Sequence, residues 1–414
     1  MNNMYVLVLL SLFICNNCTD DIALKQVEKE IVGQIKITEH ISFIDEIPKH
    51  IEKVENLTIF KEDFEPTHTL KLIPLQEFGK DKISNFASIF KSFEDKKGNL
   101  IIWGWDLNQK SSVYVYNNDG SYKTQLGRQG KGPGEYGIIL NLDVKAGKVY
   151  ISDFTSLRLN EYSTDNYFVD RSINLEVWND IDDLKFKNQV IPRNDGNYLA
   201  AYTERVLQNG QIELMYILMD SIGVRQKFNM LTIPAGFTID IRQRSSIPKP
   251  TLPLWFMGNT AIALTNEDAL YTVSTREFLV KKYNAFGQYQ SAFYYPIEGP
   301  SFVLDDYLKT AGSLAPKAKQ IKKAFDQMDE ELPQTSPFIE HMIVDDENRI
   351  WIAVTAGENY EWWILKESGE LLAKLMLPKK KPIFDIKKGF LYSKELNEEG
   401  FEYVLKYRIE ISEK

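Results

Sequence analysis

Cysteine is nearly absent from this sequence: its two cysteines, Cys15 and Cys18, lie close to the amino terminus, and none follows. The chain beyond Cys18 therefore forms no disulfide bond and no thiolate metal site. A fold without disulfides must be stabilised by its hydrophobic core. A chain of 414 residues with 43% hydrophobic residues can bury a large one.

Histidine and net positive charge are also scarce. Only four histidines occur, and His40, His50 and His68 precede the repeated part of the chain, which leaves His341 alone within it. This argues against a zinc site that draws histidines from several repeats. It also argues against a Ser-His-Asp hydrolase, for which no G-x-S-x-G motif is present. The net charge of −9 argues against general nucleic-acid binding.

The amino terminus has no charged side chain before Asp20, but it carries an apolar run of eleven residues from Tyr5 to Cys15. This run has the length of the hydrophobic region of a signal peptide and is too short to span a bilayer. The start lacks the lysine or arginine that usually precedes such a region. We expect a signal peptide over residues 1–18, with a buried amino-terminal strand as the alternative.

Cys18 and the acidic segment after it, residues 19–21, resemble the lipid-modified first residue and surface-export signal of a bacterial lipoprotein. Asn17 departs from the small residue expected before that cysteine, and Cys15 is a competing processing site. The resemblance implies an outer-membrane or periplasmic protein, or one at the cell surface, with a lipid on Cys18 as its one membrane contact. Alternatively, both cysteines are small apolar residues of a cleaved leader.

One phrase recurs along the rest of the chain: a turn with Gly or Asn, an alternating apolar strand, and a second strand that ends in a polar turn. The turn residues of the six copies are Gly98, Gly147, Gly196, Gly258, Asn348 and Gly389, with spacings of 49, 49, 62, 90 and 41 residues. Repeats of roughly 40 to 50 residues made of short strands are typical of propeller blades. We therefore predict an all-β fold, a six-bladed β-propeller of four-stranded antiparallel blades.

The gap of 90 residues contains a change of period. Ile321, Phe325, Met328 and Leu332 recur at helical spacing, with charged residues between them. We expect a short helical insertion between blades four and five, near residues 304–332. Its predicted role is to cap one end of the propeller, and a helix that binds a partner is the alternative.

The last repeat is too short for a complete blade, because only 25 residues follow Gly389. An upstream strand must supply the missing outer strand, and residues 57–60 and 69–75 are both suitable. Such closure removes exposed sheet edges. The predicted organisation is a signal peptide over 1–18, a linker over 19–54 and the propeller over 55–414.

The segment GRQGKGPGEYG, residues 127–137, and its continuation to Tyr162 resemble an NHL-type propeller repeat. More narrowly, the segment is similar to the TolB-like six-bladed propeller lipoproteins of Gram-negative bacteria. The phrase VDDENRIWIAV, residues 344–354, with Trp362 and Trp363 also fits that family. The resemblance extends from about Glu55 to the carboxy terminus, and it implies a propeller without implying an activity.

The glycine-rich segment is a candidate structural or binding loop, formed by Gly127, Gly130, Gly132, Pro133, Gly134, Glu135 and Tyr136. The glycines permit positive φ and the proline fixes its own φ, which predicts a tight loop between two blades. We expect Glu135 to accept backbone N–H groups and Tyr136 to pack on the adjacent blade. A phosphate-binding loop is disfavoured, because G-x-x-x-x-G-K-[ST] is not matched and no helix follows.

Calcium is the one cofactor that the sequence leaves open. Calcium-dependent lactonases and phosphotriesterases share this fold and bind the ion through side-chain oxygens from several blades. Asp106, Asp153, Asn266 and Asp268 lie near strand ends, and Asp153 and Asp268 are the candidate ligands. However, an aspartate at a strand end also commonly bonds the adjacent turn backbone.

Two functional hypotheses follow. The first is a binding or scaffold protein of the cell envelope, whose propeller face or central channel binds a protein, a peptide or a glycan; Trp362 or Trp363 could form an aromatic shelf for a glycan. The alternative is a calcium-dependent hydrolase of the lactonase or phosphotriesterase type, with its site in the channel. The fold by itself does not select between them.

Overall fold

The computed structural model contains one compact unit from Glu39 to Lys414 that holds all the described residues. These are residues 42–43, 46–60, 65–81, 85–178, 184–206, 210–240, 251–310, 318–325 and 331–414. The predicted signal peptide, with Cys15 and Cys18, lies outside them. Residues 46–54, which the sequence analysis assigns to a linker, belong to the folded unit, where Ile51 is fully buried.

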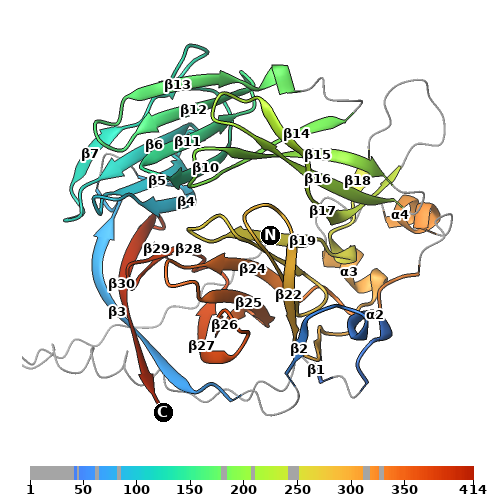
Figure 1. The fold of residues 1–414 in the computed structure, drawn as a ribbon. Coiled ribbons are helices and arrows are strands. Elements are labelled where there is room, and N and C mark those ends of the chain that lie inside the picture. Colours follow the sequence, from blue (N-terminus) through green and yellow to red (C-terminus); the bar gives the residue numbers. More distant parts are fainter. Residues whose placement is uncertain are drawn as a thin grey trace, which may run out of the picture. The chain divides into compact units, whose positions relative to one another are not determined.

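Six sheets of four or five mainly antiparallel strands form the blades, so the predicted six-bladed all-β propeller is confirmed (Figure 1). Blades 1 and 2 contain β4 (Ser88–Glu94), β5 (Leu100–Trp105), β6 (Ser111–Tyr116) and β7 (Tyr122–Gln125), then β10 (Ile139–Lys145), β11 (Lys148–Asp153), β12 (Arg158–Ser163) and β13 (Val169–Asn174). Blade 3 contains β14 (Lys185–Pro192), β15 (Tyr198–Val206), β16 (Gln211–Met219) and β17 (Arg225–Asp240), to which β18 (Thr251–Pro253) is added.

The second half of the chain forms the other three blades. Blade 4 contains β19 (Thr260–Leu264), β20 (Leu270–Ser274), β21 (Leu279–Tyr283) and β22 (Tyr289–Tyr294). Blade 5 contains β24 (Ile339–Val344), β25 (Ile350–Ala356), β26 (Asn359–Leu365) and β27 (Leu371–Pro378). Blade 6 contains β28 (Ile383–Lys387), β29 (Phe390–Leu396), β30 (Glu402–Glu413) and the upstream strand β3 (His68–Phe78).

Ring closure uses only one of the two predicted strands. β3 pairs antiparallel with β30, from His68 opposite Glu413 to Phe78 opposite Val404, so an early strand completes the last blade. The other segment, β2 (Leu57–Ile59), instead joins the outer edge of blade 4, parallel to β22. Two-residue strands form the remaining pairs, β1 (Ser42–Phe43) with β23 (Ile297–Glu298) and β8 (Arg128–Gln129) with β9 (Glu135–Tyr136).

The turn between the first two strands of a blade contains a residue with positive φ, as at Gly98, Gly147 and Gly196. Gly258 is not such a turn, contrary to the sequence analysis. It precedes β19, and the corresponding turn of blade 4 uses Asp268 with φ +63°. Aspartate tolerates the left-handed region, because its short side chain can hydrogen-bond locally, and the glycine pattern therefore missed this turn.

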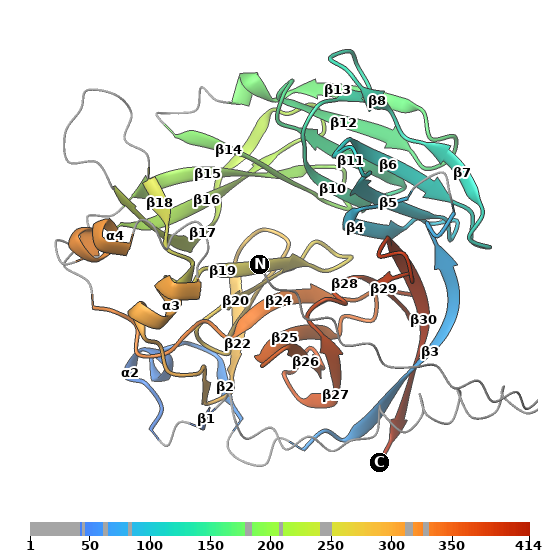
Figure 2. The same ribbon diagram turned by 180° about the vertical axis from the view of Figure 1, so that it is seen from behind.

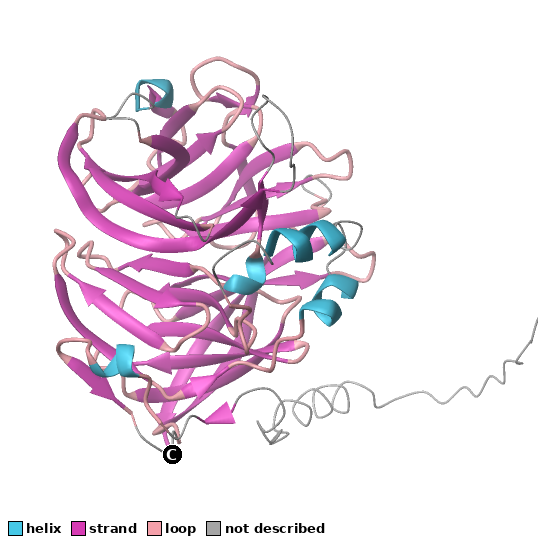
Figure 3. Ribbon diagram, turned by 90° about the vertical axis from the view of Figure 1, so that its right-hand side faces the viewer, coloured by secondary structure: helices cyan, strands magenta, loops and turns pink. Residues whose placement is uncertain are grey.

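In the part of the chain that the structure describes, helical segments are few and short (Figure 3). They are α2 (Lys49–Glu52), α3 (Leu304–Thr310), α4 (Ala318–Phe325) and two 3₁₀ turns, η1 (Leu175–Trp178) and η2 (Trp255–Met257). α3 and α4 lie between β23 and β24, which places the predicted helical insertion between blades 4 and 5. Ile321 and Phe325 are buried on α4, whereas Leu332 lies beyond the helix and is exposed.

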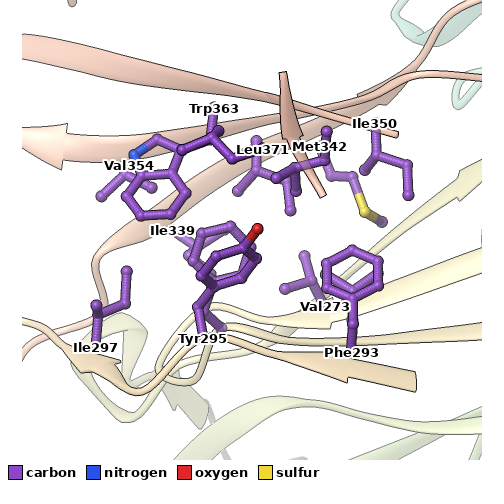
Figure 4. Close-up of a cluster of buried hydrophobic side chains, with 14 of the residues drawn as sticks. Val273, Phe293, Tyr295, Ile297, Ile339, Met342, Ile350, Val354, Trp363 and Leu371 are labelled. Carbon is purple, nitrogen blue, oxygen red and sulfur yellow. The ribbon is translucent and has the colours of Figure 1, made fainter. Parts of the chain in front are cut away.

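Hydrophobic cores fill the space between neighbouring blades. In the core between blades 4 and 5, Phe293 and Tyr295 lie opposite Trp363 and Met342 (Figure 4). Trp362, the neighbour of Trp363 on β26, points the other way and packs in the core between blades 5 and 6. Both tryptophans are buried, so the proposed aromatic shelf for a glycan is wrong: alternation along the strand places each ring in a different blade interface.

Candidate functional site

The glycine-rich segment connects β7 of blade 1 to β10 of blade 2. Within it, Arg128 pairs with Glu135 and Gln129 with Tyr136 across the short parallel pair of β8 and β9. Gly127 and Gly134 have positive φ, at +58° and +72°. Gly130 serves a different purpose, because a Cβ atom there would overlap the carboxylate of Glu135.

Glu135 holds this loop together from inside. Its Oε2 accepts the backbone N–H of Gly132 at 2.9 Å, and its Oε1 accepts Nε–H of Arg128 at 2.8 Å. The Gly132 N–H and the Arg128 guanidinium hold the pKa of Glu135 below its usual range. The carboxylate is therefore an ionised acceptor that is already used by the loop itself.

Tyr136 fastens the loop to blade 1. Its side chain is fully buried, and its hydroxyl donates to the Leu126 carbonyl at 2.9 Å. Burial raises the pKa of Tyr136 to about 12, so the hydroxyl keeps its proton. On the other side, Tyr162 and Asn160 of blade 2 donate to the carbonyls of Gly134 and Glu135. These polar groups bond other groups of the same chain, and their hydrogen bonds connect blades 1 and 2.

Asp153 occupies the end of β11, where the sequence suggested a calcium ligand. Its carboxylate accepts the backbone N–H groups of Gly137 at 3.0 Å, Ile138 at 2.9 Å and Ser156 at 2.9 Å. The side chain is 1% exposed. Asp153 therefore joins the glycine-rich loop to the hairpin of blade 2, and its oxygens point at amides.

Asp268 has the same kind of role between blades 3 and 4. It accepts the N–H groups of Asn194 at 2.8 Å and Asp195 at 3.0 Å, both in the first turn of blade 3. Asp106 bonds its own turn, and Asn266 is exposed. Among the residues that the structure describes, no three His, Cys, Asp or Glu side chains gather as a metal site.

His341 lies on β24 among aromatic rings. The Trp362 ring is nearly parallel to it, at 13° and a centroid distance of 6.3 Å, and the Tyr360 ring is edge-on at 5.5 Å. Part of the His341 side chain is exposed, and the partial desolvation of its ring by the neighbouring atoms lowers its pKa. This aromatic environment is not the acid-and-hydroxyl arrangement of a Ser-His-Asp site.

The two faces of the propeller differ in their exposed side chains. The lower face, defined by the turns between first and second strands and between third and fourth strands, carries charged turn residues, including Lys96, Lys97, Asp195, Asp346 and Lys388. Its exposed apolar side chains include Phe168, Ile222 and Phe286, which lie in turns of three different blades, 2, 3 and 4. The upper face, defined by the turns between second and third strands and by the links between blades, carries large exposed apolar side chains, including Trp105, Leu107, Ile138, Leu140, Phe154, Val177, Trp255 and Leu396.

Five of these residues, Trp105, Leu107, Ile138, Leu140 and Phe154, belong to blades 1 and 2 and are here named the apolar rim. Ile138 is 58% exposed and Phe154 52% exposed, and the Phe154 N–H donates to the Ile138 carbonyl at 2.8 Å. Their neighbour in the sequence, Ile139, is buried.

The apolar rim continues the core between blades 1 and 2 to the surface. Ile101, Trp103 and Trp105 alternate on one face of β5, and the first two pack in this core with Ile139. Trp105 extends past it and contacts Phe90 edge-on at 4.8 Å. The sequence analysis missed the apolar rim, because these residues look the same as the buried residues beside them.

No helix in the described part of the chain is long and apolar enough to cross a bilayer. In sequence, residues 85–291 match the model of a family described as 6-bladed β-propeller, DUF5128. No curated protein matches the chain.

Several solved structures resemble the fold. One is a protein of Bacteroides fragilis described as exported, 13% identical with a TM-score of 0.46, covering 86% of this chain and 99% of that one. Another is a DUF4221 member from Bacteroides vulgatus, 10% identical with a TM-score of 0.48, covering 84% and 100%. A gluconolactonase from Xanthomonas campestris is 10% identical with a TM-score of 0.39, covering 82% and 98%. These likenesses concern the fold alone.

Proposed function

Because the chain belongs to this family of 6-bladed β-propellers, we propose that it is a binding or scaffold protein of the bacterial cell envelope, whose partner docks on the apolar rim. The observation that carries the proposal is the concentration of large exposed apolar side chains on the upper face of blades 1 and 2. Contiguous exposed apolar patches on a folded protein commonly mark interaction sites. A propeller suits this role, because its loops present a surface on a rigid scaffold.

The partner is best described as a protein or peptide with apolar side chains. Trp105 and Phe154 provide the large rings that are enriched at the centres of protein interfaces. The two carboxylates that the sequence offered as candidate calcium ligands, Asp153 and Asp268, accept backbone N–H groups. This use of the carboxylates favours binding over hydrolysis.

A photo-crosslinking residue placed at Phe154 tests the docking surface in cells that express the full chain. We expect a discrete adduct from Phe154, and Trp105→Ala in the same chain should reduce its yield several-fold. Phe286, an exposed aromatic residue in a turn of the lower face, is the matched control position. Equal adducts from Phe154 and Phe286, or none from Phe154, would contradict the proposal.

The envelope location rests on the lipoprotein-like segment around Cys18. Labelling with a fatty-acid probe should mark the wild-type chain and Cys15→Ala, and it should not mark Cys18→Ala. If Cys15→Ala abolished the labelling instead, Cys15 would be the lipid-modified residue. Absence of labelling in all three chains would refute lipid anchoring. That result would not affect the docking surface, which the crosslinking experiment tests separately.

A further inference from the structure

The interface between blades 3 and 4 contains an open cleft. No residue of the apolar rim lines it. The cleft has a volume of ≈580 Å³ and lies between β17 of blade 3 and the sheet of blade 4. Pockets of about 300 to 1,000 Å³ are typical of small-molecule sites. The site is thus of suitable size for a ligand and is separate from the proposed docking surface.

The cleft is open because β17 is irregular. β17 has 16 residues, and its register with β16 shifts at three points before its end turns away to pair with β18. Leu231 and Ile233 of β17 pack with Leu270 in a core between the two blades. Beyond that core, Gly236 and Phe237 border the cleft, so the two sheets separate there.

Blade 4 presents hydroxyl groups to this space. Thr260, Thr272 and Ser274 line the cleft from β19 and β20. In blade 5, the second strand carries Ile352 and Val354 at the corresponding positions, and both are fully buried in the core between blades 4 and 5. A polar face at a place where the neighbouring blade has an apolar one fits an interface that binds a ligand rather than another sheet.

The elements added to the regular propeller gather around the same cleft. Phe237 and Met257 line it and also belong to the small core under α3 and α4, so the helical insertion closes one end. Pro48, just before α2, and Tyr294 of β22 form another side. Figures 1 and 2 show α2, α3, α4 and β18 on the same side of the ring, beside blades 3 and 4.

The charges at the cleft balance. Arg276 and Lys281 provide two positive groups, and Glu277 and Glu298 provide two negative ones. Glu277 also accepts a hydrogen bond from His50, whose Nε2 lies 2.6 Å from the Glu277 Oε1. A site with no excess of either sign favours a neutral ligand over an anion or a cation.

We propose that this cleft binds a neutral saccharide. Hydroxyl groups both donate and accept hydrogen bonds, which suits a ligand made of hydroxyl groups. Thr260 and Ser274 present theirs from partly exposed positions, and Ser274 Oγ, which accepts the Arg276 N–H at 3.2 Å, still has its own proton to donate. Tyr283 and Phe237, which are both partly exposed, supply ring surface for the apolar C–H face of a sugar. The inference goes beyond the proposed docking role and does not depend on it.

Saturation-transfer NMR on the full chain tests the proposal with maltose, cellobiose and N,N′-diacetylchitobiose as neutral probes and glucuronate as a charged one. We expect saturation transfer to at least one neutral probe and weaker transfer to glucuronate. In the double variant Thr260→Val and Ser274→Ala, the affinity for that probe should fall at least tenfold. Valine keeps the shape of threonine and alanine is smaller than serine, so both hydroxyls are removed without added bulk and the fold should be retained.

Thr58→Val is the matched control, because Thr58 is an exposed residue on the outermost strand of the same blade. It should leave the affinity within twofold of wild type. A second variant, Ser274→Phe, fills the cleft and should abolish binding. Failure of all three neutral probes to bind at millimolar concentration, or binding that survives both cleft variants, would overturn the inference. Neither result bears on crosslinking at the apolar rim.

Discussion

At the scale of single residues, buried carboxylates are satisfied by groups from neighbouring strands and blades. Glu161 of blade 2 is fully buried and bonds Lys148, Arg171 and Tyr198, the last from blade 3. Burial opposes ionisation of Glu161, but these hydrogen bonds outweigh it, and the pKa lies below its usual range. Such charges are stable only with every partner present, so they specify how adjacent blades meet.

Asp153 provides the first prediction at this scale. Asp153→Ala removes the buried carboxylate that accepts the N–H groups of Gly137 and Ser156, and we expect it to lower the free energy of unfolding by about 3 kcal/mol. Asp119→Ala, which removes an exposed turn acceptor for Ser121, should change the free energy of unfolding much less. Urea denaturation measures both. A Ca²⁺-dependent rise in Tm that Asp153→Ala removes would instead identify Asp153 as a metal ligand.

Asp385 predicts an unusual pH dependence. It accepts the Glu94 N–H at 2.9 Å, and burial raises its pKa to about 6 although that N–H and Lys387 oppose the shift. The unfolded pKa is about 3.9. The folded state therefore binds the proton more tightly, and the stability that this provides is full below about pH 4 and is lost as the pH rises through about 6.

Asp385→Asn removes this titration. We expect the variant to exceed wild type in the free energy of unfolding by about 1–2 kcal/mol more at pH 8 than at pH 4.5. Denaturant titrations of both chains at pH 4.5, 6 and 8 give the difference. A constant difference across this range would show that Asp385 does not titrate as stated.

At the scale of elements, one hairpin turn is used again and again. An Asp or Asn at the end of a strand accepts the N–H groups two and four residues later, as Asp345 does from Glu347 and Arg349, and Asn397 from Glu399 and Phe401. This turn depends on local sequence only. This local dependence explains why most of the blades could be located from the polar turn residues of the sequence.

The glycine-rich loop is the element in which we expect substitutions to be tolerated least. Gly127 has φ +58°, and a Cβ atom there would lie 2.6 Å from both the Gly134 carbonyl oxygen and the Tyr162 hydroxyl. We expect Gly127→Ala to cost about 3 kcal/mol, from left-handed strain plus overpacking. Gly196→Ala is the matched control: its φ is +84° with nothing within 4 Å, so it should cost about 1 kcal/mol. Equal losses in thermal or urea unfolding would show that the loop contacts are unimportant.

At the scale of the whole molecule, closure joins the two ends of the folded chain. Adjacent blades contact through their inner strands, β28 with β4, β4 with β10 and β10 with β14, and blades 3 and 4 contact through β17 and β19. Pairing of β3 with β30 makes blade 6 from both ends of the chain. Loss of that pairing exposes sheet edges in the last blade, which stabilises unfolded and associated states relative to the ring.

A disulfide between β3 and β30 tests how much ring closure contributes to the stability of the fold. Thr69 and Ser412 face each other in the register of β3 and β30, with their hydroxyl oxygens 2.9 Å apart. Opposed residues in an antiparallel pair have a Cα separation that a disulfide can span. We expect Thr69→Cys with Ser412→Cys to raise the free energy of unfolding by about 3–5 kcal/mol when oxidised. Each single variant and the reduced double variant should match wild type; no gain on oxidation would mean that closure already persists in the unfolded chain.

Much of the fold and little of the candidate site could be predicted from sequence. Blade number, strand alternation and the insertion between blades 4 and 5 follow from turn residues and local periodicity. The apolar rim could not be predicted, because Ile138 and Ile139 are chemically alike and only packing of blade 1 on blade 2 buries one and exposes the other. Asp153 was recognised as an oxygen donor, but which group it binds depends on a loop from elsewhere in the chain.

The sequence by itself determined the blades, because each hairpin turn and each alternating strand is specified within a few residues. Only the tertiary structure decided that β3, rather than β2, completes the last blade. Both segments have strand-like sequences, and the choice depends on contacts with residues more than 230 positions away. It also decided where the sheets separate into a cleft and where apolar side chains remain exposed, because burial is a property of the neighbours that folding brings to a residue.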